Sequence, residues 1–281
     1  MKAHGVAQPF PGPKLYQQRA EQALPILVRQ AHSQRDITYE DLAREMGMAN
    51  PRNLNFVLGS VGFTLRRAAM ELGYDVPAIQ TIVVNKATRL PGSGGQWFAA
   101  GDGYDKLDDR TRREIIKKRH QAVFTYTRWH DVLRHLKLPE VDESKRKLLE
   151  DAARSGRGSG ESAQHRALKM EVLRKPGLAG LPAISGSIEY RLPSGDALDV
   201  CFEDEQRLVA VEVKSRLSSI ADVTRGLFQV VKYVAVMEAM VAFRRSKQRV
   251  SAVLLVEGRL PVELLPLHNS LGVRVVELKR L

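Results

Sequence analysis

Residues 208–214 read LVAVEVK, an apolar run that predicts a buried β-strand but carries two charges. Because side chains alternate along a strand, Glu212 and Lys214 point to the same face. Charged side chains of this kind are almost never fully buried unless they are paired or bind a metal. The pair therefore indicates a site.

A second apolar strand precedes this one and is interrupted by a single acid. Residues 197–202 read ALDVCF, and the short polar segment 203–207 joins the two runs. This pattern predicts a β-hairpin. The hairpin would bring Asp199 close to Glu212 and Lys214, so that two carboxylates and one lysine converge.

This set of groups suits the hydrolysis of a phosphodiester. Carboxylates are hard oxygen ligands of the kind that Mg²⁺ prefers, and Mg²⁺ lowers the pKa of a bound water and stabilises charge on a phosphate. A lysine beside the metal can orient or deprotonate the attacking water, or stabilise the transition state. The alternative is a surface ion pair on an edge strand, since Glu-x-Lys is a short motif with a high rate of chance matches.

Asp199, followed on the next strand by Glu212-Val213-Lys214, resembles the motif of the PD-(D/E)xK nuclease superfamily. The resemblance implies an α/β fold with a restriction-endonuclease-like mixed-sheet core. It also implies Mg²⁺ as the cofactor, with Mn²⁺ as a substitute, held by Asp199, Glu212 and the carbonyl of Val213. Lys214 would act on the water.

Leu198 stands where the motif often has proline, and Asp196 remains an alternative ligand. A strand, a helix and a strand over residues 250–278 agree with the same core.

Two further elements extend this resemblance. Residues 160–169 are similar to the first core helix of the superfamily, in which Glu161 would be an additional metal ligand; the alternative is a first-turn acid that complements the helix dipole. We expect His165 to be an ordinary helix residue. Gln229 and Tyr233 lie one helical turn apart and resemble the Q-x-x-x-Y element of RecB-like members, which borders the active site and touches DNA. Tyr233 could equally be a core aromatic with a polar tip.

The N-terminal half predicts a mainly α-helical DNA-binding domain. Thr38 can cap a short helix that ends at Gly47, and Asn50-Pro51 can begin the next one. This order is typical of a helix-turn-helix. The other elements that we expect are helices over 15–33 and 60–72, a strand over 78–85, a glycine-rich wing over 91–98, and charged helices over 108–120 and 124–138.

This half resembles the winged-helix domain of the alkylguanine DNA alkyltransferases. The matching segments are 37–39, 50–52, 83–85 and 91–94. The reactive-cysteine motif of that family is missing, so the resemblance implies only a DNA-binding scaffold. The alternative is a winged helix used for protein contact or dimerisation. The residues that we expect to contact DNA are Arg52, Asn53, Lys86, Arg89 and Arg66.

The predicted organisation has five parts. The clearest boundary is a run of Gly and Ser, which is typical of a flexible linker. The parts are a flexible leader (1–14), the winged-helix domain (15–100), a charged helical connector (101–153), the linker (154–160) and the nuclease domain (161–281).

Composition agrees with a nucleic-acid partner. The 281 residues carry a formal net charge of +12, which favours a polyanion, and the excess is shared by both halves. The single cysteine, Cys201, suits a reducing compartment. No signal peptide or long apolar span is evident, so we expect a cytoplasmic protein with no membrane partner.

The predicted function is that of a DNA endonuclease. The domain order resembles Mrr-like restriction enzymes, which implies a role in restriction or anti-phage defence, with a homodimer or a defence-system partner protein left open. One alternative is a catalytically inactive DNA-binding or assembly subunit. Others are a DNA-repair or structure-selective nuclease, or one directed at RNA.

Overall fold

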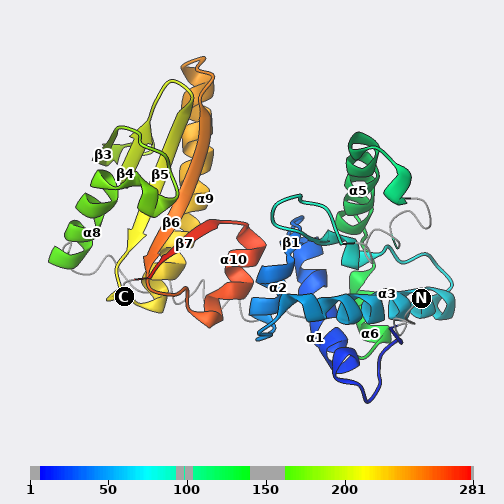
Figure 1. The fold of residues 1–281 in the computed structure, drawn as a ribbon. Coiled ribbons are helices and arrows are strands. Elements are labelled where there is room, and N and C mark those ends of the chain that lie inside the picture. The colour runs from blue at the N-terminus through cyan, green and yellow to red at the C-terminus, as the bar shows by residue number, and fades with distance from the viewer. Residues whose placement is uncertain (1–6, 93–97, 99–103, 140–161, 280–281) are drawn as a thin grey trace. The chain divides into compact units, whose positions relative to one another are not determined.

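The chain divides into two compact units in the computed structural model, Met1–Glu143 and Ser144–Leu281. The first is built mainly of helices and the second on a sheet (Figure 1). The linker predicted at 154–160 lies outside the residues that the structure describes. Those residues are 7–92, 98, 104–139 and 162–279.

Two long helices form the centre of the N-terminal unit. Helix α1 (Leu15–His32) packs against α3 (Leu54–Leu72), and both bury alanine, leucine and valine side chains at helical intervals. The other elements are β1 (Ile37–Thr38), α2 (Tyr39–Glu45), η1 (Pro51–Asn53), η2 (Ile79–Ile82), β2 (Val83–Val84), η3 (Tyr104–Lys106), α5 (Asp109–Phe124) and α6 (Trp129–His135).

The predicted caps of this unit are confirmed. The Thr38 side chain accepts a hydrogen bond from the amide of Asp41 at the start of α2. The Asn50 side chain accepts one from the amide of Arg52 at the start of η1. These caps satisfy amides that a helix leaves without partners in its first turn.

Two expectations about this unit prove wrong. Two helices were predicted between residues 50 and 72. The structure has the 3-10 turn η1 followed by one uninterrupted helix, α3. This helix contains no proline, and its Gly62 lies at a close contact. A Cβ on Gly62 would lie only 2.4 Å from Nε2 of Gln80, so the glycine permits packing rather than ending the helix. The strand predicted over 78–85 is the 3-10 turn η2 followed by the two-residue β2, which pairs in parallel with β1.

Part of the predicted leader packs onto α3. The side chain of Phe10 is buried, and its amide donates to Oγ1 of Thr64 over 2.9 Å. The guanidinium of Arg67 donates to the carbonyl of Phe10 over 2.5 Å. Most of the predicted wing, residues 93–97, lies outside the described part of the chain.

A five-stranded mixed sheet organises the C-terminal unit, with strand order β3-β4-β5-β6-β7. The first three strands are antiparallel neighbours, and β5, β6 and β7 are parallel. The hairpin predicted around 203–207 is confirmed, whereas β3 was not anticipated. The strands are β3 (Gly186–Arg191), β4 (Ala197–Glu203), β5 (Arg207–Lys214), β6 (Arg249–Glu257) and β7 (Arg274–Leu278).

Helices cover both faces of this sheet. Alternate residues of β5 pack on opposite sides: Val209 and Val211 join a cluster with helix α8 (Ala163–Arg174), while Leu208 and Ala210 join one with α9 (Ile220–Phe243). The remaining elements are η4 (Pro176–Ala179), η5 (Val262–Leu264) and α10 (Leu265–Leu271). The sheet thus lies in a three-layer α/β arrangement, as parallel pairing with crossover helices requires.

Candidate active site

The register of the β4–β5 hairpin brings Asp199 beside the Glu-Val-Lys tripeptide. Val200 pairs with Val211, and continuing this antiparallel register places Asp199 opposite Glu212. Oδ2 of Asp199 accepts a hydrogen bond from the amide of Val213 over 2.9 Å. The acid of the first strand is therefore bonded to the middle residue of the second strand's motif.

Glu212 is buried and held by two donors. Its side chain is only 4% exposed, and Nζ of Lys214 donates to Oε1 over 2.7 Å. The hydroxyl of Tyr233 donates to Oε2 over 3.2 Å, and Nε2 of Gln229 donates in turn to that hydroxyl over 3.1 Å. Residues from β5 and α9 thus form one chain of hydrogen bonds that ends on a carboxylate.

The two carboxylates differ in their electrostatics. Burial, and then the nearby charge of Asp199, raise the pKa of Glu212 above its ordinary value despite the contact with Lys214. Burial also opposes ionisation of Asp199, but hydrogen bonds from His165 and Val213 outweigh it and lower the pKa of Asp199. Asp199 is consequently the carboxylate that stays ionised, and Glu212 is the one that resists ionisation.

Gly226 on α9 makes room for the lysine. A Cβ at this position would lie 2.8 Å from Cε of Lys214 and 2.9 Å from Cδ1 of Leu254. Real Cβ atoms do not approach carbon so closely without displacing it. The missing side chain therefore lets the stem of Lys214 pass over the helix toward Glu212.

Helix α8 adds Lys169, which the sequence interpretation missed, and His165, which was expected to be an ordinary helix residue. Nε2 of His165 lies 3.3 Å from Oδ1 of Asp199, and Nζ of Lys169 lies 3.6 Å from the same oxygen. Lys169 also forms an ion pair with Glu189 of β3. The two α8 residues are four positions apart on a predicted helix and so share a face, but only the packing of α8 on the sheet reveals what that face meets.

The donor atoms fit a divalent cation in part. Two carboxylates lie close enough for the charge of one to raise the pKa of the other, and a cation between them would relieve that repulsion. Within the described ranges, no group of three or more His, Cys, Asp or Glu side chains is arranged as a metal site. Glu161, the third carboxylate predicted as a ligand, lies outside those ranges.

The predicted DNA contacts lie on separate elements of the N-terminal unit. Arg52 and Asn53 are exposed in η1, and Lys86 is exposed in the loop after β2. Arg89, in the same loop, forms an ion pair with Asp36. The fifth residue, Arg66, lies on α3 with its guanidinium 4.8 Å from the ring centre of Phe98.

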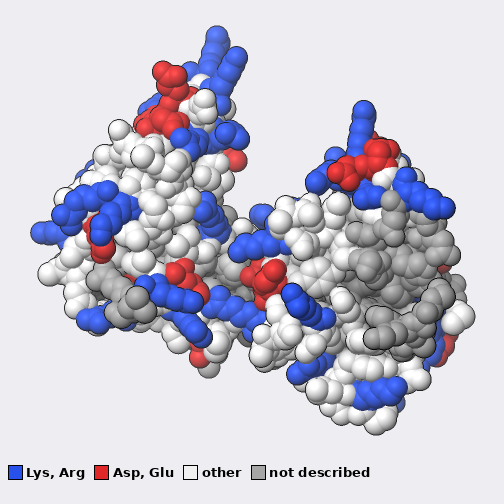
Figure 2. All heavy atoms as spheres, viewed as in Figure 1, with Lys and Arg blue, Asp and Glu red and all other residues white. Residues whose placement is uncertain are grey.

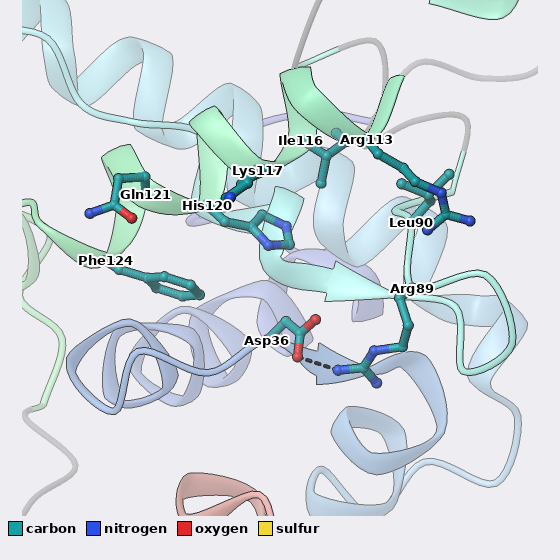
Figure 3. Close-up of a pocket in the computed structure, with 9 residues that line it drawn as sticks. All are labelled: Asp36, Arg89, Leu90, Arg113, Ile116, Lys117, His120, Gln121 and Phe124. Carbon is teal, nitrogen blue, oxygen red and sulfur yellow. Dashed lines mark hydrogen bonds and ion pairs between the residues drawn. The ribbon is translucent and has the colours of Figure 1, made fainter. Parts of the chain in front are cut away.

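On the face of each unit that Figure 2 shows, Lys and Arg side chains are spread out with acidic side chains among them. A cavity of about 300 Å³ lies beneath α5, beside the ion pair of Arg89 with Asp36 (Figure 3). His120 lines it, and its Nε2 lies 2.8 Å from the carbonyl of Thr81. A carbonyl can only accept, so Nε2 carries the proton, and burial lowers the pKa of this imidazole.

Comparisons with models of protein families, with curated proteins and with solved structures give no match. In the described part of the chain, α9 alone is long and apolar enough to cross a membrane by length and composition. A core helix passes the same test, and α9 packs Leu227, Tyr233 and Met237 against the sheet.

Proposed function

We propose that this protein is a magnesium-dependent DNA endonuclease of the PD-(D/E)xK type that acts in restriction or anti-phage defence in the cytoplasm. The observation that carries the proposal is the meeting of Asp199, Glu212 and Lys214 at one end of the β4–β5 hairpin. Burying two carboxylates and an ammonium together is costly for a fold, and a catalytic site gives a reason for it. The mixed sheet with helices on both faces supports the same interpretation.

Each residue of the site has a role in this proposal. Asp199, Glu212 and the carbonyl of Val213 would hold Mg²⁺ or Mn²⁺, with Glu161 as a further ligand. The metal would supply Lewis-acid stabilisation of the phosphate and a lower pKa for bound water. Lys214, beside that carboxylate, would orient or deprotonate the attacking water or donate to a phosphate oxygen.

Gln229 and Tyr233 act together in the same proposal. The tyrosine holds Glu212, and the glutamine holds the tyrosine. These two contacts restrict the orientation of the Glu212 carboxylate. A site is preorganised when its side chains are held in place before the substrate binds, and these hydrogen bonds contribute to that.

The N-terminal unit would hold the duplex. The net charge of +12 favours a polyanion, and contacts with phosphates position a protein on DNA before base contacts select a sequence. Arg52, Asn53 and Lys86 are exposed and available for such contacts. Arg89 and Arg66 would contribute only by exchanging or sharing their present partners, Asp36 and Phe98.

One experiment tests the proposal. The full-length chain is incubated with supercoiled plasmid, linear duplex, single-stranded DNA and RNA, each with MgCl₂, MnCl₂ or EDTA. We expect plasmid to be nicked or linearised with either metal and to stay intact with EDTA. The Asp199→Asn chain is the matched control and should be inactive with both metals.

Other outcomes of this experiment select the alternatives. Binding of duplex without cleavage under any condition would indicate a catalytically inactive DNA-binding or assembly subunit. Cleavage confined to single-stranded DNA or to RNA would replace the defence endonuclease with a structure-selective or RNA-directed nuclease.

A further inference from the structure

Lys169 is a buried ammonium whose position needs a reason. Its side chain is only 5% exposed, and a lysine is rarely buried to this extent unless its charge is matched. Among the residues that the structure describes, the carboxylate of Glu189 forms an ion pair and a hydrogen bond with it, and that of Asp199 also lies near it. The distance from Nζ to Oδ1 of Asp199 is 3.6 Å, which is longer than a hydrogen bond. The ammonium therefore bonds to Glu189 and stands beside Asp199.

Glu189 is placed for this contact by an unusual backbone. It lies in β3 between Ile188 and Tyr190, which pair with Val200 and Leu198 of β4. The same register puts Glu189 across from Asp199. Its φ is +54°, a left-handed value that a residue with a side chain seldom adopts inside a strand. Strain of this kind persists where the surrounding structure needs the conformation, and it is common at functional sites.

The position of this ammonium matters for any cation at Asp199. Oδ2 of Asp199 is already bonded to the amide of Val213, and Oδ1 is the oxygen nearest to both His165 and Lys169. A lysine that bonded Oδ1 directly would neutralise the carboxylate and occupy a lone pair that a metal needs. An ammonium held on another carboxylate leaves that lone pair accessible.

We propose that Glu189 is a positioning residue that holds Lys169 away from Asp199 and thereby keeps Asp199 available to a divalent cation. The inference rests on the proposed function, because it assumes a cation at Asp199. It assigns opposite effects to the two members of the ion pair. Glu189 favours cation binding, and Lys169 opposes it through like-charge repulsion.

The test measures the binding of Mn²⁺ to the full-length chain. The electron paramagnetic resonance signal of the free ion reports how much Mn²⁺ stays unbound. Glu189→Gln should release Lys169 onto Asp199 and weaken Mn²⁺ binding about tenfold, the lower end of what loss of a supporting residue around a metal costs. Lys169→Met should strengthen binding by at least about fivefold, which is the effect of removing the repulsion between two unit charges about 4 Å apart in water, and Mn²⁺ carries two charges. The double variant should resemble Lys169→Met, because Glu189 has no lysine left to hold.

The matched control is Glu171→Gln, which removes from α8 another carboxylate that pairs with a lysine, in this case Lys175. It should bind Mn²⁺ as the wild type does. Glu189 is 55% exposed, so its substitution is expected to leave the fold intact even if Lys169→Met does not. Circular dichroism of each variant checks this.

The outcomes separate this inference from the proposed function. The wild-type chain should bind Mn²⁺, and Asp199→Asn should abolish that binding. If no such binding is found, both the inference and the proposed function fail. If that binding is present but the Mn²⁺ affinity of Glu189→Gln stays within about twofold of the wild-type affinity, the inference alone is overturned. Loss of a supporting residue should lower the affinity by more than that. A double variant as weak as Glu189→Gln would also overturn it, because Glu189 would then act on the cation directly.

Discussion

The hydroxyl of Tyr233 donates a hydrogen bond to Oε2 of the buried Glu212, which links the middle of α9 to the central strand of the sheet. Gln229, one turn earlier on α9, donates to the same hydroxyl. The second oxygen of Glu212 is bonded to Lys214. Each oxygen of this carboxylate therefore has a donor, as a buried polar group requires.

Tyr233→Phe should destabilise the C-terminal unit by about 1–3 kcal/mol, because Oε2 of Glu212 would stay buried without its donor. Urea unfolding followed by circular dichroism measures the loss. Gln229→Leu should have a smaller effect, since it leaves the bond between Tyr233 and Glu212 in place. A Tyr233→Phe chain as stable as the wild type would show that the hydrogen bond contributes nothing to stability.

Glu212 should make the C-terminal unit less stable as the pH rises. Its pKa is raised in the folded chain, so above its unfolded value of about 4.3 the folded state holds a proton that the unfolded state has lost. The folded state then binds more protons, and the free energy of unfolding falls until the pH passes the folded pKa. Glu212→Gln should flatten this decline in melting temperature, measured by calorimetry between pH 4 and 8.

Asp199 should have the opposite dependence. Its pKa is lowered in the folded chain, so the stability it contributes is lost only as the pH falls below about 3.9. Asp199→Asn should therefore remove the part of the free energy of unfolding that is lost in acid. Calorimetry of the wild-type and Asp199→Asn chains between about pH 2 and pH 5 measures this difference.

Lys214→Ala should lower cleavage by about two to four orders of magnitude, the usual contribution of a group that acts on water in the transition state. DNA affinity should stay near that of the wild type. Lys232→Ala is a matched control, because Lys232 also pairs with a carboxylate, Asp196, but donates nothing to Glu212. Cleavage assays under single-turnover conditions compare the two, and wild-type turnover by Lys214→Ala would refute its role.

Gly226→Ala should slow cleavage although it removes no functional group. The new Cβ would come within 2.8 Å of Cε of Lys214 and must push the lysine away from Glu212. Alanine is also the better helix former, so the intrinsic helix propensity at this position should rise. Gly177→Ala, where a Cβ meets nothing within 4 Å, is the control. Full activity in Gly226→Ala would show that the stem of Lys214 moves aside without consequence.

Charge reversal on the N-terminal unit should weaken DNA binding in the full-length chain. Arg52→Glu and Lys86→Glu should each lower the magnitude of the slope of log affinity against log salt by about one unit. Binding that forms one phosphate contact fewer releases fewer counterions. Fluorescence anisotropy with a labelled duplex at several salt concentrations measures the slope.

Arg89 needs a separate control in that experiment. Its substitution also breaks the ion pair with Asp36, so Asp36→Asn must be compared with Arg89→Gln. If Asp36→Asn alone reproduces the loss of affinity, the role of Arg89 is to hold the loop. Unchanged slopes in Arg52→Glu and Lys86→Glu would favour a protein-contact role for this unit.

The two short apolar runs over 197–202 and 208–214 were enough to predict the hairpin. Short apolar runs of this length are typical of buried strands, and a short polar segment between two strands leaves few other connections. The same pattern brought Asp199 to the level of Glu212. The four-residue spacing of Gln229 and Tyr233 likewise placed them on one face of a helix, because helical geometry is local.

Local patterns failed where the outcome depended on contacts between distant segments. Two helices were predicted between residues 50 and 72, but α3 is one helix in which the small size of Gly62 permits close packing against Gln80. Residues 78–85 carry β-branched side chains typical of a strand, but only Val83 and Val84 find a partner strand. Strand propensity depends on neighbours that a local reading cannot supply.

The amino-acid sequence by itself determined which residues could meet within one hairpin and one helix: Asp199, Glu212 and Lys214, and the pair Gln229 and Tyr233. Their spacing follows from backbone periodicity alone. Only the tertiary structure decided that Tyr233 bonds Glu212, and that Lys169 of α8 stands beside Asp199 while bonded to Glu189. Those contacts join segments far apart in the chain, and they exist because the apolar faces of α8 and α9 pack on opposite sides of one sheet.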